Sequence, residues 1–162
     1  MKNRQLMAIQ FLYKKLQAMP KILLNCPEGT FSEKAKTLLA RELTDIAIRI
    51  ERLPDTAYVR STVWIYFNEY RPDNVFRGGE PGGTKVISVE VNAFSGGLDT
   101  ASKGSLITEF TASIGRHAGV TEGALVPVFI AIRNVHEDDW GTFGKRIRLQ
   151  DLYNPPVDRK PI

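Results

Sequence analysis

Met19 and Pro20 stand at the head of an apolar stretch, and we expect the chemistry of the chain to be centred on this pair. A proline that begins a chain carries a secondary amine, which can take up and release a proton. A proline inside a chain has a tertiary amide nitrogen with no proton and no basicity. Nineteen residues precede Pro20 in this sequence. Its nitrogen can therefore act as a base only in a form of the protein that begins at Pro20.

Other chemistry-bearing residues do not form a recognisable site. Cys26 is the single cysteine, so it cannot form a disulfide within the chain. With only His117 and His136 beside it, the sequence offers no His/Cys cluster for zinc. The glycine-rich stretch 78–83 leads into a predicted strand and lacks the Lys-Ser/Thr ending of a phosphate loop, so we expect a flexible connection there. We therefore expect neither a metal nor a cofactor.

The basic charge of the chain is concentrated at its N-terminus. The formal net charge is +4, from 22 Lys and Arg against 18 Asp and Glu. Residues 1–18 contain four basic residues and no acidic one, which leaves 18 of each sign in the remainder. A neutral body argues against a nucleic-acid partner. No apolar run approaches the roughly 20 residues that span a bilayer, so we expect a cytoplasmic protein without a membrane span.

The basic segment 1–18 is predicted to be an N-terminal extension. Its apolar residues from Leu6 to Leu16 recur at helical spacing, with lysines between them, which predicts a short amphipathic helix. Three origins are open: a targeting or membrane-surface peptide, a helix packed on its own domain, and an upstream translation artefact.

Strands and helices alternate after the Met-Pro pair. An apolar strand at 22–24 is followed by Thr30 and Glu33, which predict a capping box at the start of a helix. That helix has one apolar face and ends at Pro54. A second strand, rich in β-branched and aromatic residues, is predicted at about 60–68.

The same pattern then occurs again. A strand is predicted at 85–91, a helix from Asp99 or Thr100 to about Arg116, and a strand at 126–134. The inner side of this helix is predicted to hold Leu106, Ile107, Phe110 and Ile114.

An internal repeat relates the two halves. Residues 63–79 align without a gap on 128–144 at a constant offset of 65 positions, and the same offset places Pro20 opposite Lys85. Two successive β-α-β units predict an α+β (α/β) fold, with a four-stranded sheet and two helices on one face. The predicted domain is 19–152, with repeat one at 20–83, repeat two at 84–152 and a C-terminal tail at 153–162.

The sheet face without helices is predicted to be apolar. Strand alternation directs Trp64, Tyr66 and Phe129 to that face, together with Ile87 or Val89. Such a face is too apolar for water, so we expect a homo-oligomer whose sheets face inward.

Several short motifs resemble those of the tautomerase superfamily. The spacing from the proline to Glu-Gly and onward to Gly-Gly is similar to that of 4-oxalocrotonate tautomerase. Residues 74–79 resemble cis-3-chloroacrylic acid dehalogenase, and residues 138–144 resemble malonate semialdehyde decarboxylase. The resemblance covers about 20–152. The other residues that carry it are Pro27-Glu28-Gly29, Ser32-Glu33-Lys34-Ala35-Lys36, Thr44-Asp45 and Phe67-Asn68-Glu69.

The resemblance implies a fold, an assembly and a chemistry. It implies a homotrimer with active sites where subunits meet, and Pro20 as a catalytic general acid and base. The implied substrates are small enol, keto or unsaturated carboxylic acids, in a tautomerase or isomerase reaction or in a lyase or dehalogenase reaction. An α-amino group has an ordinary pKa of about 7.7–8.0, and an apolar pocket lowers it. A group of that pKa suits proton transfer near neutral pH.

The residues that bind the substrate differ from those of the superfamily members named above. Two arginines of the oxalocrotonate enzyme correspond to Thr30 and Trp64 here. A carboxylate still needs a cation or several amide donors, and Arg133 is our first candidate, with a solvent or intersubunit salt bridge as its alternative role. Arg77 is a weaker candidate. The other expected pocket residues are Trp64, Tyr66, Asn68 and Phe129, of which Trp64 and Phe129 have core or interface packing as the alternative.

Two functions follow from the state of the Pro20 nitrogen. If the chain begins at Pro20, we expect a tautomerase-like enzyme. If the extension is present, it blocks the proline, and we expect a catalytically inactive trimer that acts as a binding or scaffold protein.

Overall fold

The computed structural model of the chain describes residues 20–82, 85–155 and 158–162. The amphipathic helix predicted at 6–16 lies outside these residues. None of the described helices is long and apolar enough to cross a membrane. The main elements are β1 (Lys21–Pro27), α2 (Glu33–Ile50), α3 (Ala57–Thr62), β2 (Trp64–Tyr70), β5 (Ile87–Phe94), α4 (Thr100–His117) and β6 (Val128–Val135).

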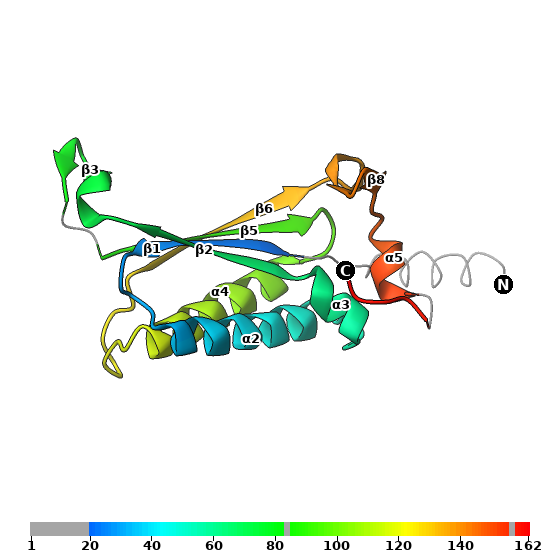
Figure 1. Cartoon of the computed structure of the whole chain (residues 1–162), viewed down its shortest axis with the longest axis horizontal. Coiled ribbons are helices and arrows are strands. Elements are labelled where there is room, and N and C mark those ends of the chain that lie inside the picture. The colour runs from blue at the N-terminus through cyan, green and yellow to red at the C-terminus, as the bar shows by residue number, and fades with distance from the viewer. Residues whose placement is uncertain (1–19, 83–84, 156–157) are drawn as a thin grey trace.

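Four strands form one sheet in the order β2-β1-β5-β6. Within each repeat the two strands are parallel, and the repeats meet where β1 pairs antiparallel with β5. The helices α2 and α4 lie side by side on one face of this sheet (Figure 1). The predicted fold class is therefore confirmed, with two β-α-β repeats and two helices on one face.

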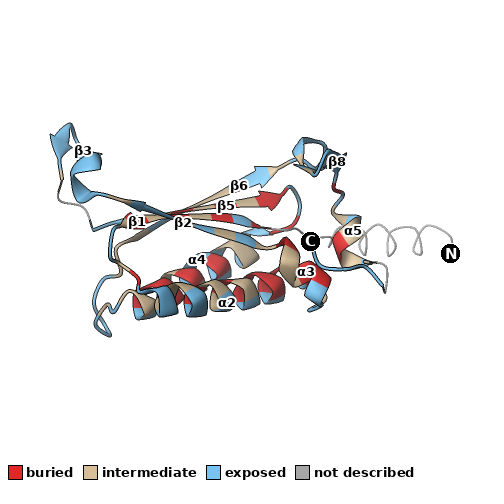
Figure 2. Cartoon of the chain, in the orientation of Figure 1, coloured by how far each residue is buried: buried red, intermediate tan, exposed pale blue. Residues whose placement is uncertain are grey.

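The hydrophobic core lies between the sheet and the two helices (Figure 2). On the central strands, Ile22, Leu24, Ile87 and Val89 are buried against this layer. The prediction that Ile87 or Val89 would share a face with Trp64 is wrong, because β5 pairs Val89 with the buried Leu24. We call the opposite side of the sheet the open face. The register places on it Lys21, Leu23, Asn25, Trp64, Tyr66, Asn68, Ser88, Glu90, Asn92, Phe129, Ala131 and Arg133.

The helix α2 begins after Ser32, not at Thr30. The Ser32 hydroxyl accepts a hydrogen bond from the backbone N–H of Ala35 at 3.1 Å, as an N-cap residue does. The Thr30 hydroxyl instead donates to the carbonyl of Pro27 at 2.6 Å. The predicted capping box is therefore wrong, because Thr30 belongs to the turn between β1 and α2.

Glu42 of α2 joins this helix to the C-terminal end of α4. Its carboxylate pairs with Arg116 and hydrogen-bonds the His117 ring at 2.9 Å. Burial raises the pKa of the Glu42 carboxyl, but the His117 hydrogen bond and the Arg116 charge outweigh burial, so the pKa lies below its ordinary value. The carboxylate is therefore ionised at neutral pH, where it holds the two helices together.

The structure corrects the alignment of the two repeats at their N-terminal ends. Trp64 and Phe129, which are 65 positions apart, pair with Lys21 and Ser88, which are 67 positions apart. Pro20 therefore corresponds to Ile87 and not to Lys85. The difference of two residues lies between the first helix and the second strand of each repeat, where only repeat one has a helix of the α3 type.

Each repeat ends in a small hairpin. The hairpin of repeat one joins β3 (Phe76–Arg77) to β4 (Glu80–Pro81), and that of repeat two joins β7 (Gly141–Thr142) to β8 (Lys145–Arg146). In the first turn Gly78 and Gly79 have φ values of 61° and 90°, as a tight two-residue hairpin requires. The described part of the glycine-rich stretch therefore forms a hairpin, and the flexibility expected of it stays a prediction.

A short helix follows the second hairpin and leads into the C-terminal residues. This helix, α5 (Gln150–Tyr153), buries Leu152, and the Tyr153 hydroxyl donates to the carbonyl of Glu51 at 3.3 Å. Farther along, the Arg159 guanidinium lies 4.6 Å from the ring centroid of Tyr58 in α3. The end of the chain thus packs against the first repeat, next to the start of β2.

We predict opposite effects of one substitution at two glycines of α4. A Cβ at Gly115 would lie 2.8 Å from a methyl carbon of Val126, whereas a Cβ at Gly104 would have no described atom within 4 Å apart from its chain neighbours and the backbone of its own helix. Gly104→Ala should stabilise the protein by about 0.5–1 kcal/mol through helix propensity. Gly115→Ala should destabilise it by about 1 kcal/mol or more through overpacking. Urea denaturation of both variants measures the difference, and the same sign at both positions would contradict the packing described.

Candidate functional site

A small cavity lies at the Pro20 end of the sheet. Its volume is about 200 Å³, at or below the lower end of the range of about 300–1,000 Å³ typical of ligand pockets. Pro20 itself is buried. The cavity is lined by Pro20, Lys21, Thr62, Trp64, Tyr66, Trp140, Gly141, Thr142 and Ile162.

Strand pairing brings one cation and two aromatic side chains to this cavity. Lys21 on β1 is the register partner of Trp64 on β2, and Tyr66 follows two positions later on the same face. The Lys21 ammonium lies 5.3 Å from the centroid of the Tyr66 ring, within the range of a cation–π contact. The site therefore combines a positive charge with an apolar wall.

The Trp64 side chain is held in place at both ends. Its indole N–H donates to the carbonyl of Ser61 at 3.0 Å. Its ring packs edge-on against Phe143 with the centroids 6.5 Å apart. Because Phe143 belongs to the hairpin of repeat two, this contact ties that hairpin to the first repeat beside the cavity.

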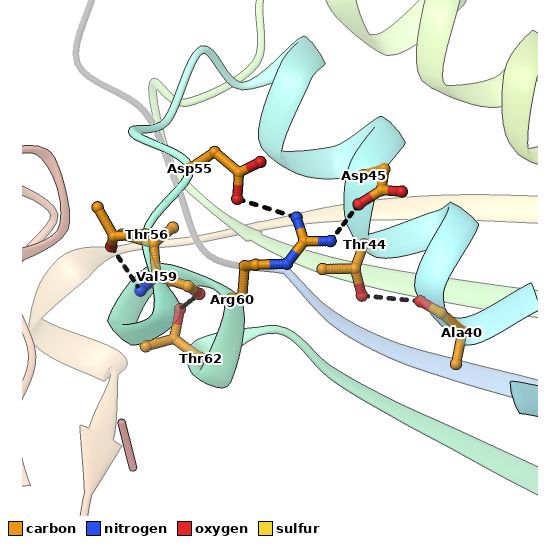
Figure 3. A network of polar contacts seen from close by, with 8 residues as sticks. All are labelled: Ala40, Thr44, Asp45, Asp55, Thr56, Val59, Arg60 and Thr62. Atoms are coloured by element: carbon orange, nitrogen blue, oxygen red, sulfur yellow. Dashed lines mark hydrogen bonds and ion pairs between the residues drawn. The ribbon is translucent and has the colours of Figure 1, made fainter. Parts of the chain in front are cut away.

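A polar network fixes α3, which leads directly into β2 (Figure 3). The Thr56 hydroxyl caps α3 by accepting from the N–H of Val59 at 3.2 Å. Arg60 pairs with Asp55 at 2.9 Å and also with Asp45 of α2. Pairs as exposed as these add about 0–1 kcal/mol each, so their main effect is to orient α3 and with it the start of β2.

Repeat two and the C-terminus supply the remaining walls. Trp140 stacks on the buried Phe94 with ring centroids 4.9 Å apart, which connects the cavity wall to the core. Gly141 and Thr142 follow in β7. The backbone N–H of Ile162 donates to the Ser61 hydroxyl at 2.9 Å and brings this residue to the cavity.

Two of the six substrate-binding residues predicted from the sequence line the cavity with Pro20. These are Trp64 and Tyr66. Arg133 lies in the same row across the open face as Lys21, with Asn92 between them. Two strand spacings, about 10 Å, separate the backbones of Lys21 and Arg133. Arg133 already pairs with Glu90 at 3.3 Å.

The other three predicted residues lie far from Pro20 within one chain. Asn68 and Phe129 lie four residues along their strands from the Trp64–Arg133 row, which corresponds to about 13 Å. Asn68 donates a hydrogen bond to Asn25 at 3.0 Å. Arg77 lies in the β3–β4 hairpin, at the opposite end of the sheet from the β7–β8 hairpin that borders the cavity (Figure 1).

Sequence reasoning missed Lys21 and Trp140 as cavity residues. Strand alternation was a sufficient signal for Lys21, because it places Lys21 on the same face as Leu23 and Asn25. Trp140 gave no such signal, because its position depends on how the second hairpin folds over the sheet.

The remaining reactive groups have structural explanations. Cys26 is buried, and burial raises the pKa of its thiol, which disfavours the nucleophilic thiolate. Among the described residues, no group of three or more His, Cys, Asp and Glu side chains could hold a metal ion. In the described part of the chain, the cavity is a small apolar space with one cation, Lys21, at its edge, which suits a small anion with an apolar part.

No family model and no curated protein sequence matches the chain. Solved structures do. The chain is similar to N1, a member of the cis-3-chloroacrylic acid dehalogenase family (TM-score 0.65, 16% identity, 79% of this chain and 83% of that one). It is similar to an asymmetric trimer of a fused 4-OT (TM-score 0.63, 22% identity, 78% of this chain and 94% of that one). It is also similar to Pt0534 inactivated by 2-oxo-3-pentynoate (TM-score 0.64, 16% identity, 83% of this chain and 99% of that one). At these identities the likeness concerns the fold.

Proposed function

We propose that this chain, which has the fold of the tautomerase superfamily, is a tautomerase-like enzyme acting on small enol, keto or unsaturated carboxylic acids. Its acid–base group is Pro20, in a form of the protein that begins at that residue. The observation that carries the proposal is the position of Pro20, which is buried at a small cavity walled by Trp64, Tyr66 and Trp140.

The chemistry is proton transfer at one nitrogen. When an enol such as that of phenylpyruvate enters the cavity, the protonated amine gives its proton to the enol carbon, and the nitrogen takes up the hydroxyl proton. The keto acid forms and the amine is again protonated, so no other reactant is required. Apolar surroundings such as Trp64 and Trp140 lower the pKa of an amine, which favours exchange near neutral pH.

We further propose a cytoplasmic homotrimer. Trp64, Tyr66 and Phe129 on the open face are 40%, 39% and 63% exposed in the single chain, although they are large and apolar. Contact between copies of the open face would remove this surface from water. The similar fused 4-OT structures are described as trimers, which supports this assembly.

The proposal is tested with protein that begins at Pro20. We expect it to accelerate the ketonisation of phenylenolpyruvate, followed by the loss of enol absorbance, and we expect Pro20→Ala to abolish most of this activity. Equal ketonisation rates for the unaltered protein and Pro20→Ala would exclude Pro20 as the acid–base group. Thermal unfolding of both proteins serves as the control for folding.

A second candidate function is a non-catalytic binding or scaffold protein. The observation that favours it is the peptide bond between Met19 and Pro20, which makes the proline nitrogen an amide. The mass of the endogenous protein separates the two candidates, because it identifies the first residue as Met1 or Pro20. The scaffold role further predicts that deletion of residues 1–18 changes assembly or partner binding, and a deletion without effect on either would exclude it.

A further inference from the structure

We propose that Lys21 binds the carboxylate of the ligand in the Pro20 cavity, and that the ligand carries an apolar or aromatic group beside this carboxylate. The inference rests on the cavity of the proposed function and adds to it the residue that binds the carboxylate.

Lys21 lies next to the proton-transfer group. It is the residue directly after Pro20, so the two Cα atoms are about 3.8 Å apart. Both residues line the same cavity. In a 2-oxo acid the enolisable carbon lies only two bonds from the carboxylate carbon. A cation next to the proton-transfer group is therefore at the scale that such a substrate requires.

The Lys21 ammonium can bind an incoming anion. It lies 5.3 Å from the Tyr66 ring centroid. A cation–π contact holds the charge at the cavity wall without neutralising it by a carboxylate. The side chain is exposed, so its N–H groups can donate to an incoming anion. A charge-assisted hydrogen bond of this kind is stronger than one between neutral groups.

Neither of the two arginines predicted to bind the substrate lines the cavity. Arg133 is paired with Glu90 at 3.3 Å and stands two strands away from Lys21. Arg77 lies in the hairpin at the other end of the sheet. Among the residues that the structure describes, Lys21 is thus the cation that borders the cavity beside Pro20.

The size and walls of the cavity define the rest of the ligand. A volume of about 200 Å³ suits a small molecule. The Trp64 and Trp140 side chains, fixed by Ser61 and Phe94 respectively, form rigid aromatic walls. Such walls favour an aromatic or branched apolar group beside the carboxylate.

The test measures binding and not turnover. Calorimetric titration of the full chain with phenylacetate, which has no enolisable keto group, is repeated for Lys21→Met, Lys21→Arg and the control Lys34→Met, which removes an exposed lysine from α2. We expect Lys21→Met to weaken phenylacetate binding about 10-fold or more, since hydrogen bonds to charged groups contribute about 1.5–3 kcal/mol. Lys21→Arg should recover most of the affinity, and Lys34→Met should match the unaltered chain.

A neutral ligand separates charge from packing. 2-Phenylethanol should bind the unaltered chain and Lys21→Met equally, because it has no carboxylate. Equal phenylacetate affinity in these two proteins, or no saturable phenylacetate binding, would overturn the inference. A loss of affinity in Arg133→Met instead of Lys21→Met would also overturn it and would assign the carboxylate to Arg133.

The outcome is distinguishable from failure of the proposed function. Phenylacetate binding requires no proton transfer at Pro20. A protein that is inactive but binds phenylacetate through Lys21 would therefore refute the proposed enzymatic function and support the proposed carboxylate site. In active protein that begins at Pro20, Lys21→Met should raise KM for the enol with a smaller change in kcat. An active Lys21→Met variant with an unchanged KM for the enol would refute the role of Lys21 and leave the proposed enzymatic function standing.

Discussion

Retention of Met19 in front of Pro20 should lower kcat/KM for phenylenolpyruvate by about 10²- to 10⁴-fold, the range typical of a lost general acid–base group. The reason is that the added residue turns the proline amine into an amide, which cannot exchange a proton. The comparison is between protein that begins at Pro20 and protein that begins at Met19, with enol absorbance as the measurement. The mass of each protein verifies its first residue.

A covalent probe provides an independent readout of the same nitrogen. 2-Oxo-3-pentynoate, which inactivates the structurally similar Pt0534, carries an alkyne conjugated to a ketone. A free Pro20 amine can form an N–C bond to the alkyne while one π bond breaks and the amine proton moves to the adjacent carbon. The protein that begins at Pro20 should gain the full mass of the reagent on the Pro20 nitrogen, and in the Met19 form this nitrogen should stay unlabelled. Equal kcat/KM and equal labelling in the two forms would refute the role of Pro20.

Leu106→Ala should lower the free energy of unfolding by about 2–5 kcal/mol, the range for removing a large aliphatic side chain from a core. Leu106 is fully buried on the sheet side of α4. The effect is large compared with a total stability of about 5–15 kcal/mol for a typical domain. Urea denaturation, followed by circular dichroism, measures it.

The adjacent Ile107 offers a matched control. It has the same number of carbon atoms as Leu106, but it is 41% exposed on the outer side of α4. Ile107→Ala should cost well below half as much as Leu106→Ala, because surface substitutions usually change stability by about 0.5 kcal/mol or less. Similar losses at both positions would show that α4 is rotated relative to the sheet.

The order of strands and helices was predictable because each element has a clear local signal. Apolar runs separated by Pro and Gly marked the strands, and apolar residues at helical spacing marked α2 and α4. The hairpins escaped notice, because their two-residue strands are too short to show a period. The prediction of Ile107 on the inner side failed for a related reason: Leu106 and Ile107 are adjacent, and only packing against the sheet decides which of them is buried.

Strand register could not be read from the repeat. The constant offset of 65 holds for β2 and β6 and for the hairpins that follow them, where the sequences are most alike. It fails for the helices and for the first strands, which are 67 positions apart, because the segment between the helix and the second strand is two residues longer in repeat one and includes α3. Extending the offset to the chain start therefore paired Pro20 with Lys85 in place of Ile87.

The candidate site was predictable in part. Strand alternation placed Trp64 and Tyr66 on one face of the second strand, and both line the cavity with Pro20. The choice of Arg133 followed from the same alternation. Alternation does not show how many strands separate two residues, and it does not show that the Arg133 guanidinium forms an ion pair with Glu90. Lys21 was overlooked although it is the nearest cation to Pro20 in the sequence.

The antiparallel pairing of β1 with β5 has a consequence for how the duplicated chain folds. Taken alone, each β-α-β unit would present an unpaired strand edge with an apolar side, the kind of surface that promotes aggregation. Pairing across Lys21–Asn25 and Ser88–Asn92 closes both edges at once. Neither unit is complete without the other, so the two copies are expected to fold cooperatively and not as independent modules.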